Sequence, residues 1–470
     1  MGPFKSIQFL LLGLSGCSAA VTDFTPCETN ASCRDAFGFG WECMDDGFCD
    51  LMEPHPRCLE TFPSDLYTRP EVYKDTVVFG SLMNHTDSKP YVEAAELALF
   101  LVSDDLTAGS FAVIHCKTDD DLSIDGLTGD ERITKPALWL ADTVGIPGLI
   151  GPDFSSTTVT AYDVLEPFDV FMMSPSATSE ELTTIDGTDK SDDNPGIFWR
   201  TAPPDTLQAR VIAQDMTLRS RNRVGVIFTN GSYGSGLAAS FRQNFEGEVI
   251  ERPFLSDSER DEAIYDFGID PLIEEVLFIS PEVADYAALI NAAKIIEGYA
   301  SKGLFLTDGA AQQSLLDTTS ESTDVYPKIR GTRPARPSGT LWGYFTTSYF
   351  NHYGRNPLND AYSAYAHDAG WLTLYAAARS SFQNGAVTGL GMASAMRQIS
   401  DGNSVTLNRS AWPYGLELLQ SGASIDVEGS SGALDYDPVT EETFAPIEVW
   451  DIDGGEGTPW SLGTIRVVTE

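Results

Sequence analysis

Two clusters of hydroxyl side chains are the strongest candidates in this sequence for a ligand-binding site. Ser155 and Ser156 follow the apolar run 148–150 and begin a segment with helical spacing. Ser176, Ala177 and Thr178 follow the next apolar run. The first turn of a helix offers free backbone N–H groups and the positive end of the dipole, which favour an anion such as a carboxylate. The sequence therefore predicts a site for an anionic or strongly polar group. The alternative is that the hydroxyls only cap a helix.

Motifs for several other chemistries are absent from the sequence. The glycine-rich stretch 231–236 lacks the GK[ST] ending of a P-loop. The chain contains no GxSxG nucleophile elbow and no HExxH zinc motif. The acidic runs 119–121 and 192–193 lack the spacing of an EF-hand loop. We therefore expect no metal, no cofactor and no catalysis, with a secreted hydrolase as the alternative from another class.

Cysteines are concentrated near the N-terminus. Those that follow Cys17 are Cys27, Cys33, Cys43, Cys49, Cys58 and Cys116. An even number in an exported chain indicates disulfides, and the segment holding the first four is too short to build a core without them. Zinc is the competing interpretation, although zinc sites favour CxxC-like pairs with His. The last two cysteines are left as a pair that would tie a linker to the main domain, while the pairing of the first four stays open.

Alternating strands and helices must position these residues. Apolar runs typical of buried strands occur at 76–82, 111–115, 148–152, 170–174, 223–228, 275–279 and 302–306. Helical spacing is found between several of them, at 91–102, 137–144 and 155–165. This order predicts an α/β fold with parallel sheets covered by helices on both faces, and ligands bind at the carboxyl ends of such strands. The span from 75 to 465 is too long for one such sheet, so we expect two lobes.

The composition excludes some partners. The chain has 470 residues, and 29 Lys and Arg stand against 69 Asp and Glu, for a net charge of −40. A surface this acidic repels phosphate backbones and anionic lipid headgroups, so we expect no nucleic-acid partner. Hydrophobic residues make up 42% of the chain, which is enough for a packed core.

The N-terminus has the features of an export signal. A Lys precedes an apolar run that is too short to span a bilayer, and small residues follow it. The stretch 14–17, Leu-Ser-Gly-Cys, resembles the bacterial lipobox, in which the chain is cleaved before a diacylated Cys. We therefore expect a signal peptide over 1–16 and a lipid anchor at Cys17. An ordinary signal peptide with a chance Cys is the alternative.

The loops after the strands resemble those of the branched-chain amino acid (Leu/Ile/Val) binding proteins of ABC importers, in the type I periplasmic binding protein family. The residues that carry the resemblance are the Ser/Thr stretch 155–158, Ser-Pro-Ser-Ala-Thr at 174–178, Arg-Thr at 200–201 with Asp205 and Gln208, Tyr-Gly-Ser-Gly at 233–236, Leu-Thr-Asp-Gly at 306–309, Tyr-Ala-His-Asp-Ala at 365–369, and 429–437. The resemblance covers roughly residues 75–465. It implies two parallel-sheet lobes joined by a hinge, with an amino acid held between them.

The resemblance also implies roles for particular residues. In that family the ligand carboxylate and ammonium are held by the Ser/Thr loop and the next loop, and a Tyr closes over the ligand. The family usually binds the ammonium with a Glu whose slot falls on Ala284 here, where Asp285 or Glu282 could substitute after a small shift. The expected ligand-binding residues are Ser155, Ser156, Ser176, Ala177, Thr178, Tyr233, Asp285 and Asp308.

These observations predict a domain organisation and a function. We expect a Cys-rich module and linker over 17–74, a first lobe over 75–200 and 345–428, and a second lobe over 201–344 and 429–465. The protein would be an extracytoplasmic lipoprotein of the bacterial cell envelope, at the periplasmic face or the outer membrane. It would capture a small polar ligand, such as an amino acid, for an ABC permease. A ligand-sensing receptor without a transporter is the alternative. In either case the protein would contact the membrane only through its lipid anchor.

Overall fold

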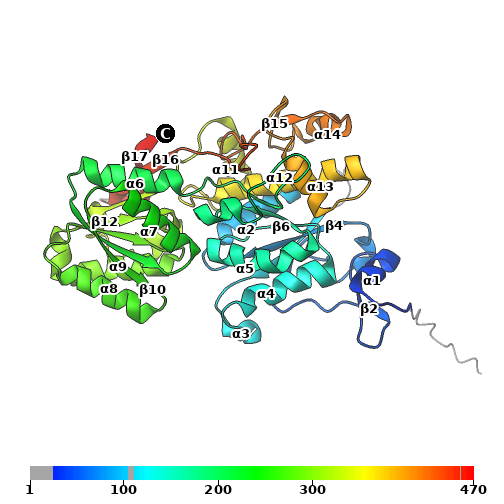
Figure 1. Ribbon diagram of the computed structural model, residues 1–470, viewed down its shortest axis with the longest axis horizontal. Helices are drawn as coiled ribbons and strands as arrows, with labels where there is room; N and C mark the ends of the chain where they lie inside the picture. The colour runs from blue at the N-terminus through cyan, green and yellow to red at the C-terminus, as the bar shows by residue number, and fades with distance from the viewer. Residues whose placement is uncertain (1–24, 104–110, 456, 470) are drawn as a thin grey trace, which may run out of the picture.

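The computed structural model describes residues 25–103, 111–455 and 457–469, and these form two α/β lobes beside a small N-terminal module (Figure 1). The predicted two-lobed fold and the Cys-rich module are therefore confirmed. Cys17 and the expected signal peptide lie outside the described residues. No helix in the described part of the chain is long and apolar enough to cross a membrane.

The first lobe is built on a six-stranded sheet with the order β3-β5-β4-β6-β7-β8. Its strands are β3 (Glu60–Phe62), β4 (Val77–Met83), β5 (Phe111–Lys117), β6 (Gly148–Ile150), β7 (Phe171–Ser174) and β8 (Phe198–Arg200). All neighbours are parallel except β3, which runs antiparallel to β5 at the edge. The apolar runs predicted the four central strands to within two residues. They did not predict β3 as a strand, and it brings part of the expected linker into this sheet.

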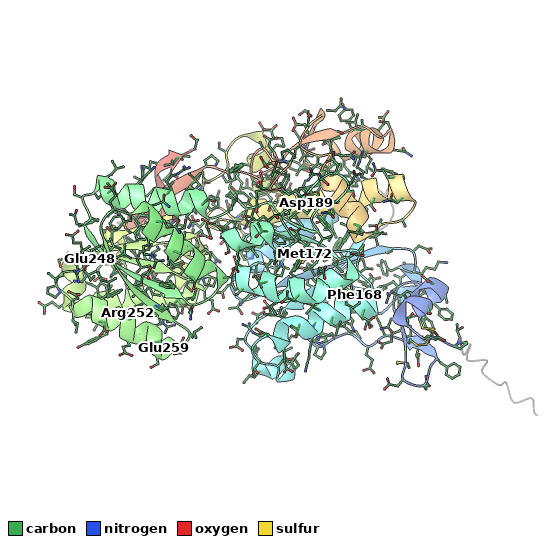
Figure 2. The ribbon with its side chains drawn as sticks, viewed as in Figure 1. Phe168, Met172, Asp189, Glu248, Arg252 and Glu259 are labelled. Carbon is green, nitrogen blue, oxygen red and sulfur yellow. A yellow bond between two sulfur atoms is a disulfide. The ribbon has the colours of Figure 1, made fainter. Side chains whose placement is uncertain are left out.

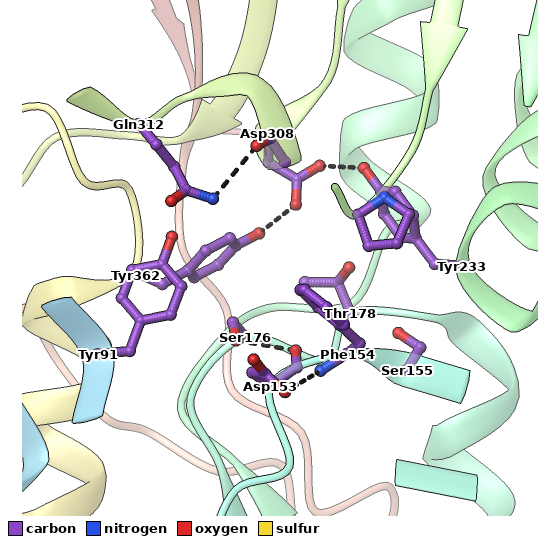
Figure 3. Close-up of a pocket in the computed structure, with 12 residues that line it drawn as sticks. Tyr91, Asp153, Phe154, Ser155, Ser176, Thr178, Tyr233, Asp308, Gln312 and Tyr362 are labelled. Carbon is purple, nitrogen blue, oxygen red and sulfur yellow. Dashed lines mark hydrogen bonds between the residues drawn. The ribbon is translucent and has the colours of Figure 1, made fainter. Parts of the chain in front are cut away.

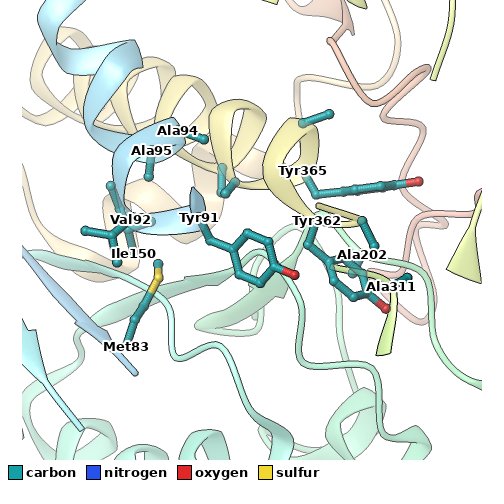
Figure 4. Packing of buried hydrophobic residues seen from close by; sticks show 14 of the residues in the cluster. Met83, Tyr91, Val92, Ala94, Ala95, Ile150, Ala202, Ala311, Tyr362 and Tyr365 are labelled. Carbon is teal, nitrogen blue, oxygen red and sulfur yellow. The ribbon is translucent and has the colours of Figure 1, made fainter. Parts of the chain in front are cut away.

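Helices cover both faces of this sheet, and for that reason its central strands are mostly apolar. Phe79 and Met83 of β4 pack on the side of α2 (Lys89–Val102) and α12 (Ser363–Asn384), as Figure 4 shows for Met83. Val78 and Leu82 pack on the opposite side, against α4 (Glu131–Leu138) and α5 (Ser155–Leu165). Small residues let α2 and α12 approach closely: a Cβ on Gly370 would lie 2.6 Å from the carbonyl oxygen of Ala95.

The second lobe is built on a seven-stranded sheet with the order β10-β9-β11-β12-β13-β16-β17. Its strands are β9 (Arg223–Thr229), β10 (Glu248–Phe254), β11 (Glu275–Ile279), β12 (Gly303–Leu306), β13 (Ile329–Pro334), β16 (Ile447–Gly455) and β17 (Thr458–Val468). The first five are parallel, and β16 and β17 are added antiparallel. The edge strand β10 carries charged side chains such as Glu248 and Arg252, which discourage pairing with another chain (Figure 2).

Two helix pairs cover the second sheet. Helices α6 (Thr206–Leu218) and α7 (Ser232–Asn244) pack on Val224 and Leu277, and α8 (Asp257–Ile269) and α9 (Val283–Ile295) pack on Ile227 and Phe278. The remaining elements are α3 (Leu122–Asp125), α10 (Gln313–Thr318), α11 (Thr340–Tyr353), α13 (Gly389–Met396), α14 (Trp412–Gln420) and the parallel pair β14 (Asn403–Thr406) and β15 (Ile425–Glu428).

The N-terminal module is held by crossed disulfides. It consists of α1 (Asn30–Phe37), β1 (Trp41–Cys43) and β2 (Cys49–Leu51). The bonds join Cys27 to Cys43, Cys33 to Cys49 and Cys58 to Cys116. The third bond is the predicted link between the linker and the main domain. All six sulfurs are bonded to sulfur, so none of these cysteines is a thiolate that could bind zinc.

One segment packs differently from the expected domain organisation. Residues 429–446 were expected in the second lobe, but they contact elements of the first. The Ser430 N–H donates to Asp368 of α12 at 2.8 Å, and Arg200 at the end of β8 forms an ion pair with Glu442. Buried charges hold the segment here, because a buried carboxylate is tolerated only beside a cation or strong donors. We propose that the second lobe resumes only at β16.

Candidate functional site

A cavity lies between the two lobes (Figure 3), and its empty space, part of which is open to solvent, amounts to about 370 Å³. It is lined by Tyr91, Asp153, Phe154, Ser155, Ser176, Thr178, Tyr233, Pro281, Asp308, Gly309, Gln312 and Tyr362. Most of these residues follow the carboxyl ends of parallel strands, which is where the strand order predicts a ligand site. The structure thus brings together five of the eight residues expected from the sequence: Ser155, Ser176, Thr178, Tyr233 and Asp308.

The first-lobe wall of the cavity is the start of α5 and the loop after β7. Phe154 is the N-cap residue of α5, and no side chain of the described residues caps this helix. The Ser155 hydroxyl instead accepts from the Ser179 N–H at 3.2 Å, and the Ser176 hydroxyl donates to the carbonyl of Asp153 at 2.9 Å. The two serines therefore join the loops to each other. The interpretation that Ser155 is only a helix cap is wrong, and the first turn of α5 can receive a ligand anion.

Arg200 fixes the shape of the loop after β7. Its guanidinium donates to the carbonyls of Ala177 and Ser179 at 3.0 and 2.9 Å, and to the two oxygens of Glu442 at 2.7 and 2.5 Å. Ala177 is fully buried and does not line the cavity. Its carbonyl is already engaged by Arg200, so Ala177 shapes the loop from behind.

The second-lobe wall is centred on Asp308, which is 4% exposed. One carboxylate oxygen accepts from the Tyr233 hydroxyl and the Gln208 amide, both at 2.5 Å, and the other accepts from the Tyr362 hydroxyl at 2.7 Å. All three donors are uncharged. Asp308 forms no salt bridge within the described part of the chain, so its negative charge can attract a cationic group of a ligand.

A second carboxyl group, that of Asp205, lies close to Asp308. Burial, and then the proximity of Asp308, raise the pKa of Asp205 well above its usual range. The Thr178 hydroxyl lies beside this carboxyl group. Burial and the charge of Asp308 also raise the pKa of both Tyr233 and Tyr362, so these phenols stay protonated as donors. Burial and the nearby Asp308 carboxyl group thus both disfavour the charged form of Asp205.

The other expected residues line an outer hollow of about 850 Å³, which shares Phe154, Ser155 and Tyr233 with the cavity. Ser156 is exposed there. Asp285 is buried in the first turn of α9, where it pairs with Arg260 at 2.7 Å and accepts from the Ser280 hydroxyl at 2.5 Å. The carboxylate of Asp285 is thus neutralised by the protein itself, whereas that of Asp308 is not.

Sequence reasoning missed four polar residues of the cavity: Tyr91, Asp153, Gln312 and Tyr362. Tyr91 and Asp153 each follow a strand of the first sheet, so the rule that identified Ser155 could also have found them. Asp153 lies two residues before the Ser/Thr stretch 155–158, where only the hydroxyls were considered. Tyr362 precedes α12 and is distant in the sequence from the other lining residues, and no local pattern indicates its position.

The structure offers little support for the hydrolase alternative. The His367 ring accepts a hydrogen bond from the Trp371 indole at 3.1 Å through one nitrogen, and its other nitrogen lies 3.1 Å from the Ser430 hydroxyl. Both ring nitrogens are therefore engaged, and His367 is fully buried away from the cavity lining. A general base must reach the proton of its nucleophile beside the substrate. His367 does not meet that condition.

The two lobes and the cleft between them have the type I periplasmic binding protein fold. The chain belongs to the family described as the receptor family ligand binding region, whose model matches residues 64–455. The predicted family resemblance is therefore confirmed.

Solved structures with this fold include several solute-binding proteins. The leucine-binding protein LivK of Thermotoga maritima matches with a TM-score of 0.63 at 16% identity, covering 84% of this chain and 99% of that one. LivJ of Streptococcus pneumoniae, solved with isoleucine, gives 0.61 at 16% identity over 83% and 99%. A solute-binding protein of R. palustris with 4-hydroxybenzoate gives 0.61 at 13% identity over 84% and 98%. At these identities the matches show the fold.

One curated relative is a receptor. The metabotropic glutamate receptor of Drosophila melanogaster is 29% identical over 155 residues, which is 31% of this chain. The match spans only 15% of that receptor's length. These family members and structural neighbours are binding proteins and receptors.

Proposed function

We propose that the protein is an extracytoplasmic solute-binding protein that captures an amino acid, or a closely related small polar ligand, between its lobes. The observation that carries the proposal is the opposition of two kinds of wall across one cavity. Ser155, Thr178 and the first turn of α5 offer hydrogen-bond donors to a carboxylate, and Asp308 with Tyr233 offers a negative charge to an ammonium. An α-amino acid carries both groups on adjacent atoms.

The ligand would link the two lobes, because each wall belongs to a different sheet. Binding with hinge closure is then the whole mechanism, and no bond needs to break. We propose an ABC importer as the partner that receives the ligand. The segment shared with a metabotropic receptor favours a ligand-sensing protein without a transporter as the second candidate.

The first-lobe wall can be tested by calorimetry with an amino acid identified in a thermal-shift screen. Ser155→Ala and Thr178→Ala should each weaken binding roughly tenfold to a hundredfold, because each removes a hydrogen bond to a charged group worth about 1.5–3 kcal/mol. Ser156→Ala is the matched control, since Ser156 is exposed in the outer hollow, and it should keep the parent affinity. Parent-like binding by both Ser155→Ala and Thr178→Ala would refute this placement of the carboxylate.

We also propose that Cys17 carries the lipid anchor. Two acyl chains hold a protein stably on a bilayer where one chain would not. Cys17→Ser should abolish labelling by palmitate in a bacterial host and release the protein into the soluble fraction. The six remaining cysteines are already in disulfides, so the substitution should leave the folded body unchanged. Palmitate labelling that persists in Cys17→Ser would contradict the anchor.

A further inference from the structure

Most buried carboxylates outside the cavity have a cationic partner. Glu442 pairs with Arg200 at 2.5 Å, Glu448 with Arg333 at 2.5 Å, and Asp285 with Arg260 at 2.7 Å. This is the expected pattern, because an unpaired buried charge costs several kcal/mol. The cavity departs from it. Asp153 and Asp308 are 1% and 4% exposed, and neither forms a salt bridge within the described residues.

The cavity lining contains no Lys and no Arg to balance these two carboxylates. They come from different lobes: Asp153 follows β6 of the first sheet, and Asp308 follows β12 of the second. In Figure 3 they lie on opposite sides of the space between the walls. One ligand ammonium at Asp308 would therefore leave Asp153 without a cation.

Asp153 is oriented towards the start of α2. Its carboxylate accepts from the Asn84 N–H at 2.9 Å and from the Phe154 N–H at 3.1 Å. Tyr91, in the first turn of α2, lines the same end of the cavity, and burial followed by the charges of Asp360, Asp308 and Asp153 raises the pKa of its phenol well above the usual range. Asp360 is also buried and forms no salt bridge among the described residues. Arg355 is close enough to favour the charged form of Asp360, but among the described residues no cation forms a salt bridge with any of these three carboxyl groups, so this end of the cavity has a negative potential.

The properties of the carboxyl groups agree with a missing cation. Burial raises the pKa of Asp153 to about 6, and burial together with Asp153 and Asp119 raises that of Asp87 to about 6. A cation beside Asp153 would favour its charged form. The net charge of −40 would also attract a cationic ligand towards the cleft.

We propose that the ligand is an amino acid with a cationic side chain, whose second positive charge lies against Asp153 at the Tyr91 end of the cavity. This inference rests on the proposed function, which supplies the carboxylate site and the ammonium site at Asp308. A neutral aliphatic side chain would leave Asp153 buried and unpaired, and an acidic side chain would meet like charges. A basic side chain would pair with Asp153 and would not be repelled by the carboxyl groups of the cavity.

Calorimetry with matched pairs of amino acids tests the inference on the unaltered protein. The pairs are ornithine with norvaline, lysine with norleucine, and arginine with citrulline; the members of each pair differ in charge and little in size. We expect the cationic member of at least one pair to bind at least about tenfold more tightly, the effect of one charge-assisted contact. If the neutral member binds as well or better in every pair, Asp153 does not select a cation. The inference then fails while the proposed function stands.

In Asp153→Asn the ratio of the affinities for the cationic and the neutral member of that pair should fall close to one, because the substitution removes the charge and keeps the side-chain shape. Asp193→Asn is the matched control, since Asp193 is exposed and outside the cavity, and it should keep the preference. A preference that survives in Asp153→Asn would assign the discrimination elsewhere and overturn the role of Asp153. If no α-amino acid of any charge binds the parent protein, the proposed function fails and the inference falls with it.

Discussion

Asp308→Asn should lower the affinity for an amino acid by roughly 30-fold to a few thousandfold, the equivalent of about 2–5 kcal/mol. The reason is that Asp308 is the one charged group of the second-lobe wall among the described residues, and its three hydrogen-bond donors are neutral. An ammonium beside Asn would lose its buried countercharge. Calorimetry with the parent ligand measures the change.

The folded state without ligand should respond in the opposite direction. Asn keeps the shape of Asp, can accept from Tyr233 and Gln208, and can donate to the hydroxyl oxygen of Tyr362. It also removes an uncompensated charge that lies beside Asp205. We therefore expect the melting temperature of Asp308→Asn without ligand to equal or exceed that of the parent. The exposed Asp324→Asn serves as the control for a lost charge on this lobe.

That combination separates a binding role from a structural one. A residue that only supports the fold would lower the melting temperature and the affinity together. Affinity within threefold of the parent in a folded Asp308→Asn would show that the ligand ammonium is held elsewhere. Asp285 would then be the next residue to test, although its pairing with Arg260 argues against it.

The sequence predicted the strands and the loops after them because both depend on local patterns. Runs such as 224–228 and 276–279 contain no polar side chain, which is typical of strands covered on both faces. The strand-then-loop rule placed Ser155, Ser176 and Tyr233 on the cavity without any knowledge of tertiary contacts. The pairing of Cys58 with Cys116 followed once four cysteines had been assigned to the module.

Other features depended on contacts between residues far apart in the chain. Arg260 decides which of Asp285 and Asp308 is available to a ligand ammonium, because its side chain on α8 pairs with Asp285 on α9. Residues 429–446 are held on the first lobe by the ion pair between Arg200 and Glu442, which are 242 positions apart. Neither ion pair has a local signature, because 69 acidic residues are available to 29 basic ones and the sequence alone does not say which of them meet.

Arg200→Met is expected to be the most destabilising single substitution around the site. The guanidinium is 1% exposed, forms a two-point ion pair with Glu442, and donates to the carbonyls of Ala177 and Ser179. Removing one partner of a buried pair costs about 3–5 kcal/mol because the other charge stays buried. We expect the melting temperature to fall by on the order of 10 °C. Arg210→Met, at an exposed arginine of α6, should change it little.

The double substitution Arg200→Met with Glu442→Met separates the two tasks of this arginine. Replacing both charges by apolar side chains removes the stranded carboxylate, so most of the lost stability should return. The carbonyls of Ala177 and Ser179 would still lack their donor, so the loop after β7 should remain poorly ordered and ligand affinity should stay low. Thermal melts and calorimetry on the single and double variants measure the two quantities. If affinity returns together with stability, Arg200 acts only through its ion pair and does not shape the binding loop.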